Sequence, residues 1–275
     1  MGENGEVTTL LSAVLDIARE AAALANDLTR GGVSALATKS TAVDVVTIVD
    51  RQVETLIRRR ITEQFPGDGI FGEEEAATAS STGRTWVVDP IDGTTNLLYG
   101  LPQYGVSIAV VEGDPATWSW TALAGVVINP VTGEEFSAAR GEGAFLDGNP
   151  IHVTRPASLA QSLLATGFAY DADTRTRQAE VVSRIIARVR DIRRLGACSL
   201  DLCALAAGRV DAYFERTLSA WDFAAGALIA EEAGAELRGW GGAAPSRDWM
   251  LVAHPDIIDD YERLLVDAGA HFDLK

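Results

Sequence analysis

The stretch WVVDPIDGTTN, residues 86–96, decides how the rest of the sequence is interpreted. Its first residues form an apolar run typical of a β-strand. The proline after Asp89 has no N–H group and favours an extended backbone before it, which predicts that the strand ends at Asp89. Asp92 then precedes Gly93 and Thr94, a pattern typical of a helix start with Asp92 at or near the N-cap.

Such a helix start is typical of a phosphate site, because the free N–H groups of Gly93, Thr94 and Thr95 point at whatever ligand lies there. Two carboxylates beside a phosphate would repel it unless cations intervene. Oxygen ligands without histidine indicate Mg²⁺, with Mn²⁺ as a possible substitute, rather than zinc. The alternative for these residues alone is a capped turn with no ligand.

Composition limits the possible partners. The chain has 275 residues, of which 47% are hydrophobic and 23% charged, as in a folded protein with a sizeable core. Its net charge of −16 repels nucleic acid and anionic membranes, so neither is an expected partner. The same charge repels a phosphate substrate, which again requires local cations.

The N-terminal sequence and the cysteines indicate a cytoplasmic location. The N-terminal residues carry acids where a secretory signal has a basic region, and no apolar run reaches about 18 residues. Cys198 and Cys203 do not form a C-x-x-C pair, and the three histidines are scattered, so no zinc-type cluster is visible. We therefore expect a cytoplasmic protein with no membrane span.

Hydrophobic periodicity divides the chain into two layered halves, about 1–153 and 154–275, of one compact unit. The first half begins with two amphipathic helices, 7–29 and 45–65, followed by a short strand within 69–75 that leads into acids. β-branched and aromatic runs separated by turn residues then predict β-structure from 86 to about 153. In the second half, strands alternate with helices, which indicates α/β layering. Its strands are predicted near 163–168, 210–215 and 249–255, and its helices over 174–190, 200–207, 222–234 and 255–268.

Further acids stand beside apolar runs. Glu73 and Glu74 follow the strand-like run of GIFGEEE, Asp222 begins a helix in SAWDFAAG, and Asp50 lies near the front of a helix in VTIVD. Each has a simpler interpretation, respectively a solvated surface, a helix cap and a stabiliser of the helix dipole. Their combination carries more weight than any one of them.

In this order, GEE, WVVDPIDGTTN and WDFAAGALIAEEAG resemble the inositol monophosphatase family of metal-dependent sugar-phosphate phosphatases, within the fructose-1,6-bisphosphatase/inositol monophosphatase superfamily. The likeness covers nearly the whole chain, from TKSTAVDVVTIVD to WDFAAG. It implies an α/β fold, a layered αβαβα sandwich with metals between its halves. It also implies a homodimer and inhibition by lithium.

The resemblance implies metal ligands at matched positions. Glu73, Asp89 and the backbone carbonyl of Ile91 would hold the first Mg²⁺. Asp89, Asp92 and Asp222 would hold the second, with Asp89 bridging the two. Glu73 would help to hold a third, water-rich ion, so that each site takes two to three.

For the reaction, the resemblance implies that Thr94, with Asp50 behind it, orients the attacking water. Glu73 or the Asp50/Thr94 pair would accept the proton of that water. The N–H groups of Gly93 and Thr94 would bind the phosphate. No serine, cysteine or histidine nucleophile is required.

On the substrate side, Glu215 matches the family's acceptor for a ring hydroxyl, and Asp222 is expected to face the substrate as well as a metal. Gly196, Ala197 and Cys198 match the small-residue wall of the substrate pocket. Many relatives have alanine in place of Cys198, and this departure leaves the fine substrate preference open.

Two basic features have alternative interpretations. Lys39 is either a solvated loop residue or the lysine that the family places on a loop near the metals, and Ala42 stands where relatives often have proline. Seven arginines lie between Arg175 and Arg194, where interleaved acids and apolar residues indicate a solvated amphipathic face rather than a nucleic-acid site. Arg193 or Arg194 could instead reach the pocket rim or a subunit contact.

The expected reaction is the Mg²⁺-dependent hydrolysis of a small phosphate monoester, with myo-inositol-1-phosphate as the first choice. Histidinol phosphate is the alternative, followed by other sugar or nucleotide phosphates cleaved within the family. A haloacid-dehalogenase-type phosphatase has D-x-D-G-T with an aspartyl nucleophile, whereas the two aspartates here are three positions apart. A regulatory or RNA-associated protein on the same fold is the non-enzymatic alternative.

Overall fold

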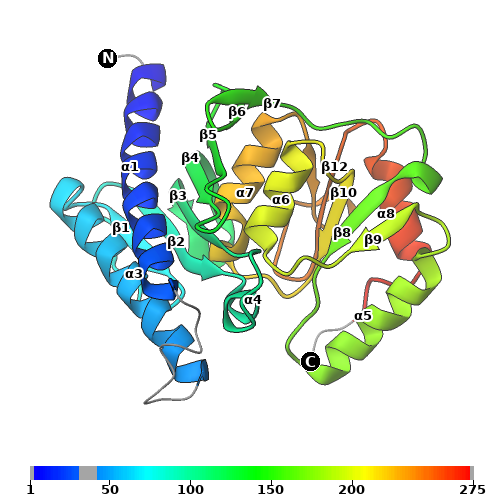
Figure 1. The fold of residues 1–275 in the computed structure, drawn as a ribbon. Coiled ribbons are helices and arrows are strands. Elements are labelled where there is room, and N and C mark those ends of the chain that lie inside the picture. The colour runs from blue at the N-terminus through cyan, green and yellow to red at the C-terminus, as the bar shows by residue number, and fades with distance from the viewer. Residues whose placement is uncertain (1–2, 31–41, 273–275) are drawn as a thin grey trace.

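The fold consists of alternating layers of helices and sheets (Figure 1). The computed structural model describes residues 3–30 and 42–272, with side chains for 7–30 and 48–272. A helix pair, a seven-stranded sheet, a second helix pair, a five-stranded sheet and a third helix pair follow one another across the molecule. This arrangement confirms the predicted αβαβα sandwich.

The first helix pair covers the seven-stranded sheet and consists of α1 (Glu3–Thr29) and α3 (Ala42–Gln64). The sheet has the order β1-β2-β3-β4-β5-β6-β7, with β1 parallel to β2 and the other neighbours antiparallel. A short helix, α4 (Thr94–Leu98), follows β2, and a 3₁₀ turn, Pro115–Thr117, follows β3. The strands are β1 (Gly69–Gly72), β2 (Arg84–Asp92), β3 (Gly105–Asp114), β4 (Ser119–Ile128), β5 (Glu135–Ala139), β6 (Ala144–Leu146) and β7 (Asn149–Ile151).

The five-stranded sheet has the order β11-β12-β10-β8-β9. β8 is parallel to both β9 and β10, whereas β12 is antiparallel to its neighbours. Its strands are β8 (Leu163–Thr166), β9 (Asp191–Arg193), β10 (Ala212–Glu215), β11 (Glu236–Arg238) and β12 (Met250–Ala253). The helices beside it are α5 (Ala172–Ile185), α6 (Cys198–Ala206), α7 (Ala220–Glu232) and α8 (Ile258–Asp267). Two 3₁₀ turns complete this half, Leu159–Gln161 and Trp240–Gly242.

The predicted helices all occur, with ends shifted by a few residues. The largest shift is in α5, which ends at Ile185 and not at residue 190. The strands β9 and β11 were not predicted, because three residues are too few to show a period. None of the described helices is both long and apolar enough to cross a membrane.

Three apolar cores lie between the layers. On α3, Val49, Val53, Ile57 and Ile61 recur every four residues and are buried against the first sheet. Both faces of β3 are covered, and its buried run therefore shows no alternation. Every residue of α6 is buried, since this helix lies between the two sheets.

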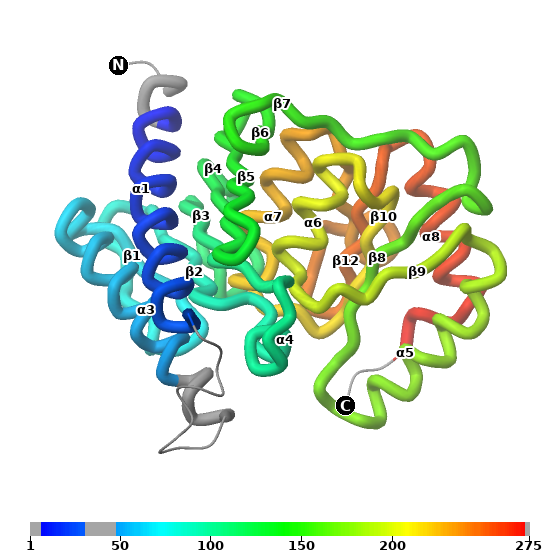
Figure 2. Tube along the Cα trace, viewed as in Figure 1, coloured from blue at the N-terminus to red at the C-terminus, as the bar shows by residue number. Residues whose placement is uncertain are grey.

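The chain does not cross the layers in order, as the trace in Figure 2 shows. After the first sheet it forms β8 of the second sheet and the outer helix α5, and only then the central helices α6 and α7. α1 lies in one outer layer, and α5 and α8 lie in the opposite one. The α6/α7 layer between the sheets joins the two halves through close backbone contacts. A Cβ added at Gly125 of β4 would lie 3.0 Å from Ala225 Cα of α7, so this sheet and this helix approach as closely as a glycine permits.

Gly226→Ala is expected to destabilise the protein by about 1–3 kcal/mol. In an exposed helix the same change would stabilise by up to about 1 kcal/mol. Here the new Cβ would lie 2.9 Å from Leu202 Cβ and 3.0 Å from Ser199 O, which would force α6 and α7 apart. Urea denaturation of the variant and the parent measures the change. Equal or greater stability of the variant would contradict this account of the central layer.

Candidate metal and phosphate site

The acidic motif has a different local structure from the one predicted. The prediction that the strand ends at Asp89 is wrong, because β2 continues to Asp92 with a register shift against β3 between these two residues. Pro90 lies within that irregularity, where the missing N–H group is tolerated. Gly93, and not Asp92, is the N-cap residue of α4, with a φ of 96° that glycine adopts without strain.

Gly93 is also a point of close approach. A Cβ at this position would lie 2.9 Å from Gln103 O and 3.1 Å from Ala197 Cβ. The glycine therefore lets the end of β2 pack against the segment that leads into α6. This contact joins the first half of the chain to the second half at the site.

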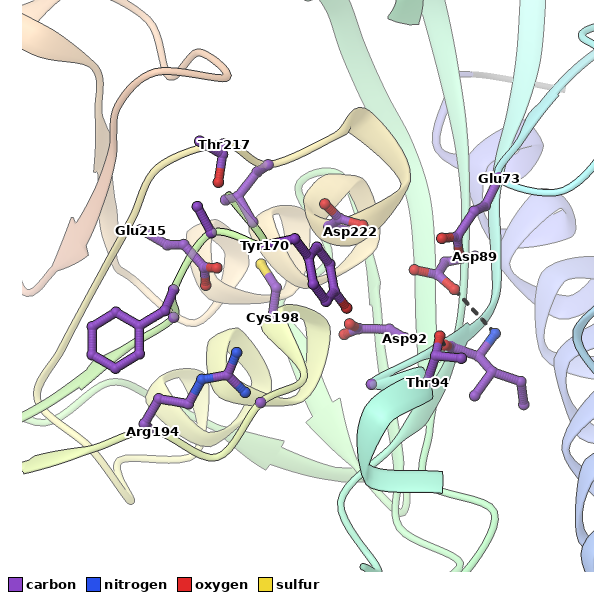
Figure 3. A pocket seen from close by; sticks show the side chains of 17 residues that line it. Glu73, Asp89, Asp92, Thr94, Tyr170, Arg194, Cys198, Glu215, Thr217 and Asp222 are labelled. Atoms are coloured by element: carbon purple, nitrogen blue, oxygen red, sulfur yellow. Dashed lines mark hydrogen bonds between the residues drawn. The ribbon is translucent and has the colours of Figure 1, made fainter. Parts of the chain in front are cut away.

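An acidic cleft opens where these segments meet (Figure 3). It gathers residues from β2, α4, α6, β10 and α7 and from the loops after β1, after β8, before α6 and after β10. Most of the predicted site residues line it, namely Glu73, Asp89, Ile91, Asp92, Gly93, Thr94, Gly196, Cys198, Glu215 and Asp222. The other lining residues are Gly167, Phe168, Ala169, Tyr170, Arg194, Thr217 and Leu218.

Two predicted site residues lie behind the cleft lining. Ala197 is buried against Gly93, so it supports the wall and does not line it. Asp50 is also buried and absent from the lining. Lys39 lies outside the described residues.

Three of the acids are anchored through one carboxylate oxygen by N–H or hydroxyl donors. Asp89 Oδ1 accepts from Ile91 N at 3.0 Å. Asp92 Oδ2 accepts from Ser199 N at 2.7 Å and from Ser199 Oγ at 2.5 Å. Asp222 Oδ2 accepts from Ser219 N at 2.6 Å, within a capping box at the start of α7. Each anchor fixes the orientation of its carboxylate at the wall of the cleft.

Burial and mutual repulsion raise the pKa values of these acids. Burial raises the pKa of Asp89 well above its ordinary value, and repulsion from Glu73 and Asp92 adds to it. Burial and repulsion from Glu74 raise the pKa of Glu73 to about 7, although hydrogen bonding to Asp89 lowers it. The pKa of Asp92 is raised to about 6, because burial outweighs its hydrogen bonds from Ser199. The pKa of Asp222 is likewise raised well above its usual range, first by burial.

The acids fit a divalent cation by their chemistry. Buried carboxylates that repel one another need either protons or a positive charge, and an oxygen-only donor set suits a hard cation such as Mg²⁺. Within residues 3–30 and 42–272, no group of three or more His, Cys, Asp or Glu side chains is already arranged to hold an ion. The acids of the motif nevertheless line one cleft.

The predicted pair of Asp50 and Thr94 is not formed in the structure. Thr94 Oγ1 donates to Ile91 O at 3.1 Å. Asp50 is the ninth residue of α3, beyond the first turn in which an acid interacts with the helix dipole. Its Oδ1 has no hydrogen-bond partner in the described part of the chain, and burial raises its pKa to about 8. This oxygen is thus a buried polar atom without a partner in the described residues, and Glu73 is near enough for its charge to raise the pKa of Asp50 further.

At the other end of the cleft, Glu215 is held by residues that the sequence did not single out. Tyr213 OH donates to Glu215 Oε2, as these two residues share one face of β10. A Cβ at Gly167 would lie 2.0 Å from both carboxylate oxygens of Glu215, so the loop after β8 can approach Glu215 only as glycine. The period of two along β10 was the signal for Tyr213, whereas no local pattern marks Gly167.

Other residues at this end differ in exposure. Tyr170, also not predicted, is 88% exposed at the mouth of the cleft. Arg194 lines the cleft, which agrees with the predicted position at the pocket rim. Its positive charge lowers the pKa values of Asp92 and Glu215. Burial raises the pKa of the Cys198 thiol, which is therefore a neutral wall residue.

An αβαβα sandwich with an acidic, cation-suited cleft between its sheets has the architecture of the sugar-phosphate phosphatases. A model of the inositol monophosphatase family matches residues 6–264. The chain belongs to the inositol monophosphatase family, and it is a phosphatase. The family, fold and enzyme class expected from the sequence are thereby confirmed.

Named relatives and solved structures agree with this assignment. The chain is 42% identical to the inositol-1-monophosphatase of Mycobacterium leprae over 253 residues, which are 88% of this chain and 84% of the relative. The solved structure of Mycobacterium tuberculosis SuhB superposes with a TM-score of 0.81 at 38% identity, covering 96% of this chain and 98% of that one. A Pseudomonas aeruginosa protein named Nus factor SuhB is 38% identical over 231 residues, 80% of this chain and 83% of its own.

Without divalent cations, the free energy of unfolding is expected to rise as the pH falls from 8 to 6. Glu73 and Asp92 have folded pKa values of about 7 and about 6, above their ordinary values of 4.5 and 3.8. The folded state therefore binds more protons, and this stability, complete below about pH 4, is lost as the pH rises through the folded pKa values. Saturating Mg²⁺ should flatten the profile by replacing the protons. Urea denaturation at three pH values, with chelator and with Mg²⁺, measures both effects.

Asp92→Asn should reduce the slope of the chelated profile, because it removes one of the titrating acids. Glu112→Gln is the matched control, since it removes a negative charge at the opposite end of β3. The control should keep the slope of the parent. A parent profile that is the same with chelator and with Mg²⁺ would contradict the cation site.

Proposed function

We propose that this protein is a Mg²⁺-dependent phosphatase that hydrolyses myo-inositol-1-phosphate to myo-inositol and phosphate. The observation that carries the proposal is the convergence of acids from distant segments on one cleft, beside the start of α4 and opposite Glu215. The printed name of the 42% identical relative supports the substrate. The cytoplasm is the expected location.

The cation end of the cleft would take two to three Mg²⁺, with Mn²⁺ as a possible substitute. Its ligands would be the side chains of Glu73, Asp89, Asp92 and Asp222, together with Ile91 O. When bound, the cations would neutralise the phosphate, lower the pKa of water and stabilise the leaving alkoxide.

The chain's own groups would bind the phosphate and take the proton. The N–H groups of Gly93 and Thr94, at the start of α4, would bind the phosphate, because the start of a helix favours an anion. Glu73, or the Asp50/Thr94 pair, would accept the proton of the attacking water. Thr94 donates to Ile91 O in the structure, so its hydroxyl has to rotate before it can pair with Asp50.

The substrate end would recognise the ring of the ester. Glu215 would accept a hydrogen bond from a ring hydroxyl, with Tyr213 holding its carboxylate. Gly196 and Cys198 form a small-residue wall, backed by Ala197, against which the ring would pack. Histidinol phosphate, and other sugar or nucleotide phosphates, are the alternative substrates.

A regulatory or RNA-associated function is the second candidate, and the relative named Nus factor SuhB favours it. The acids expected to bind the metals all line the cleft, so we propose such a role only in addition to turnover. We further propose a homodimer, inhibition by lithium, and a single domain with halves at about 1–153 and 154–275. The close contact of Gly125 with α7 supports the single domain, because it joins the halves.

Asp92→Asn is expected to lower kcat/KM for inositol-1-phosphate by about 100-fold or more. Loss of a residue that only orients a metal ligand costs up to about 100-fold in activity, and loss of a direct ligand should cost at least as much. The measurement is phosphate release from a panel of monoesters that includes histidinol phosphate, with and without Mg²⁺. Glu112→Gln should keep the parent activity. A parent that strongly prefers histidinol phosphate would replace the proposed substrate, and unchanged turnover in Asp92→Asn would overturn the site. An aspartyl-phosphate trapped on Asp89 would favour the haloacid-dehalogenase-type alternative.

Gly167→Ala is expected to raise KM for inositol-1-phosphate about tenfold, because the new methyl group would displace the Glu215 carboxylate. Hydrolysis of phenyl phosphate, which has no ring hydroxyls, should change little. Glu112→Gln, at the far end of β3 from the cleft, is again the control and should leave both activities as in the parent. Equal losses on both substrates would show that Gly167 supports the cleft in general and not Glu215.

A further inference from the structure

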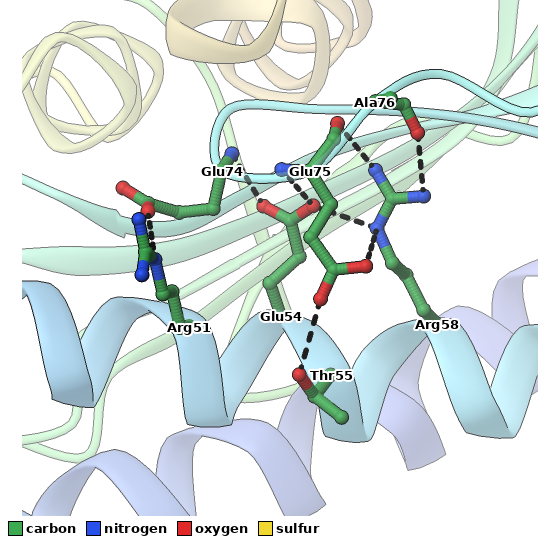
Figure 4. Close-up of polar contacts among 7 residues, drawn as sticks. All are labelled: Arg51, Glu54, Thr55, Arg58, Glu74, Glu75 and Ala76. Atoms are coloured by element: carbon green, nitrogen blue, oxygen red, sulfur yellow. Dashed lines mark hydrogen bonds and ion pairs between the residues drawn. The ribbon is translucent and has the colours of Figure 1, made fainter.

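One face of α3 is directed at the acidic turn that follows β1 (Figure 4). Arg51, Glu54, Thr55 and Arg58 are spaced at three, four and seven residues, so they lie along one side of the helix. The turn, residues 73–76, runs past these side chains and carries Glu73 into the cleft. None of the four helix residues lines the cleft.

Glu54 binds the N–H side of this turn. Its carboxylate is 0% exposed and accepts from Glu74 N at 2.8 Å and from Glu75 N at 3.1 Å. The preceding Gly72 allows this approach, because a Cβ there would lie 2.5 Å from Glu54 Oε1. A buried carboxylate needs a positive partner, and Arg58 Nε supplies it at 2.7 Å.

Arg58 binds the carbonyl side of the same turn. Its side chain is only 12% exposed, and its terminal nitrogens donate to Glu75 O at 2.9 Å and to Ala76 O at 3.1 Å. One residue pair on α3 thus holds both the donors and the acceptors of the turn. Backbone groups held from both sides leave the turn little freedom to rotate.

The same face of α3 separates the three consecutive acids. Glu74 Oε2 lies 3.5 Å from Arg51 Nε, and Glu75 Oε1 accepts a hydrogen bond from Thr55 Oγ1 at 3.2 Å. Glu73 is the member of the run that faces the cleft, beside Asp89. Which acid enters the cleft is therefore decided by α3 and not by the run itself.

We propose that Glu54 and Arg58 are positioning residues that lock the 73–76 turn with Glu73 facing the cleft, and that they thereby set the affinity for divalent cations without touching them. This inference rests on the proposed cation site. If the turn moved so that Glu74 faced the cleft in place of Glu73, the carboxylate of Glu74 would not lie where the other ligands expect one. Loss of the contacts that Glu54 and Arg58 make with the turn should therefore weaken cation binding more than it lowers kcat at saturating cation.

The test is titration calorimetry of MgCl₂ or MnCl₂ into the chelator-treated full chain. Arg58→Ala and Glu54→Gln are expected to weaken binding about tenfold or more, as for residues that orient a ligand. At saturating Mg²⁺, kcat should return to within about threefold of the parent. Arg59→Ala and Glu63→Gln are the matched controls, because this neighbouring pair is exposed and its charges lie 3.9 Å apart on the surface. Both controls should bind as the parent does.

The possible outcomes separate this proposal from the one it rests on. If the parent binds the cations and the Arg58 and Glu54 variants bind them equally well, the positioning role is overturned and the cation site stands. If the parent binds no cation, both proposals fall together. Arg58→Lys decides the matter if Arg58→Ala does not fold, because lysine keeps the charge beside Glu54 but cannot hold both carbonyls. An intermediate affinity of the lysine variant is expected, and parent-like affinity would contradict the role of the carbonyl contacts.

Discussion

Mutual repulsion among buried carboxylates is the constraint on which the site depends. Glu73, Asp89, Asp92 and Asp222 lie in one cleft, and burial there raises the pKa of each. A fold can tolerate such a group only if it is protonated, paired or neutralised by a bound cation. A divalent cation bound in the cleft would therefore offset the negative charge of these carboxylates. An acidic protein needs such a local positive charge in order to bind a phosphate ester.

The protein anchors these acids in a way that preserves the repulsion. Asp89, Asp92 and Asp222 are held by backbone N–H groups or a serine hydroxyl, which orient a carboxylate without cancelling its charge. Glu54, on α3, is held in a different way, because its carboxylate forms a largely buried ion pair with Arg58. The two treatments indicate two uses of the same functional group, one to attract a cation and one to hold a turn.

The cleft has two chemically different ends because two layers of the fold meet there. The first sheet and α4 supply the acids and the helix start, and the second sheet supplies Glu215 with its partner Tyr213. The α6/α7 layer lies between them and contributes Asp222 to one end and Cys198 to the other. The proposed cation-binding and ring-binding ends of the cleft are therefore built from different layers of the fold.

The sequence by itself determined the family, the layered fold and most of the residues that line the cleft, because periodicity and short acidic motifs are local properties of the chain. Only the tertiary structure decided that β2 continues past Pro90 and that Thr94 donates to Ile91 O. It also decided the close approach of Tyr213 and Gly167 to Glu215. The same holds for the choice of Glu73 among three consecutive acids. Each of these depends on contacts between segments far apart in the chain, such as α3 with the turn after β1, and no local pattern records which side chain another segment will meet.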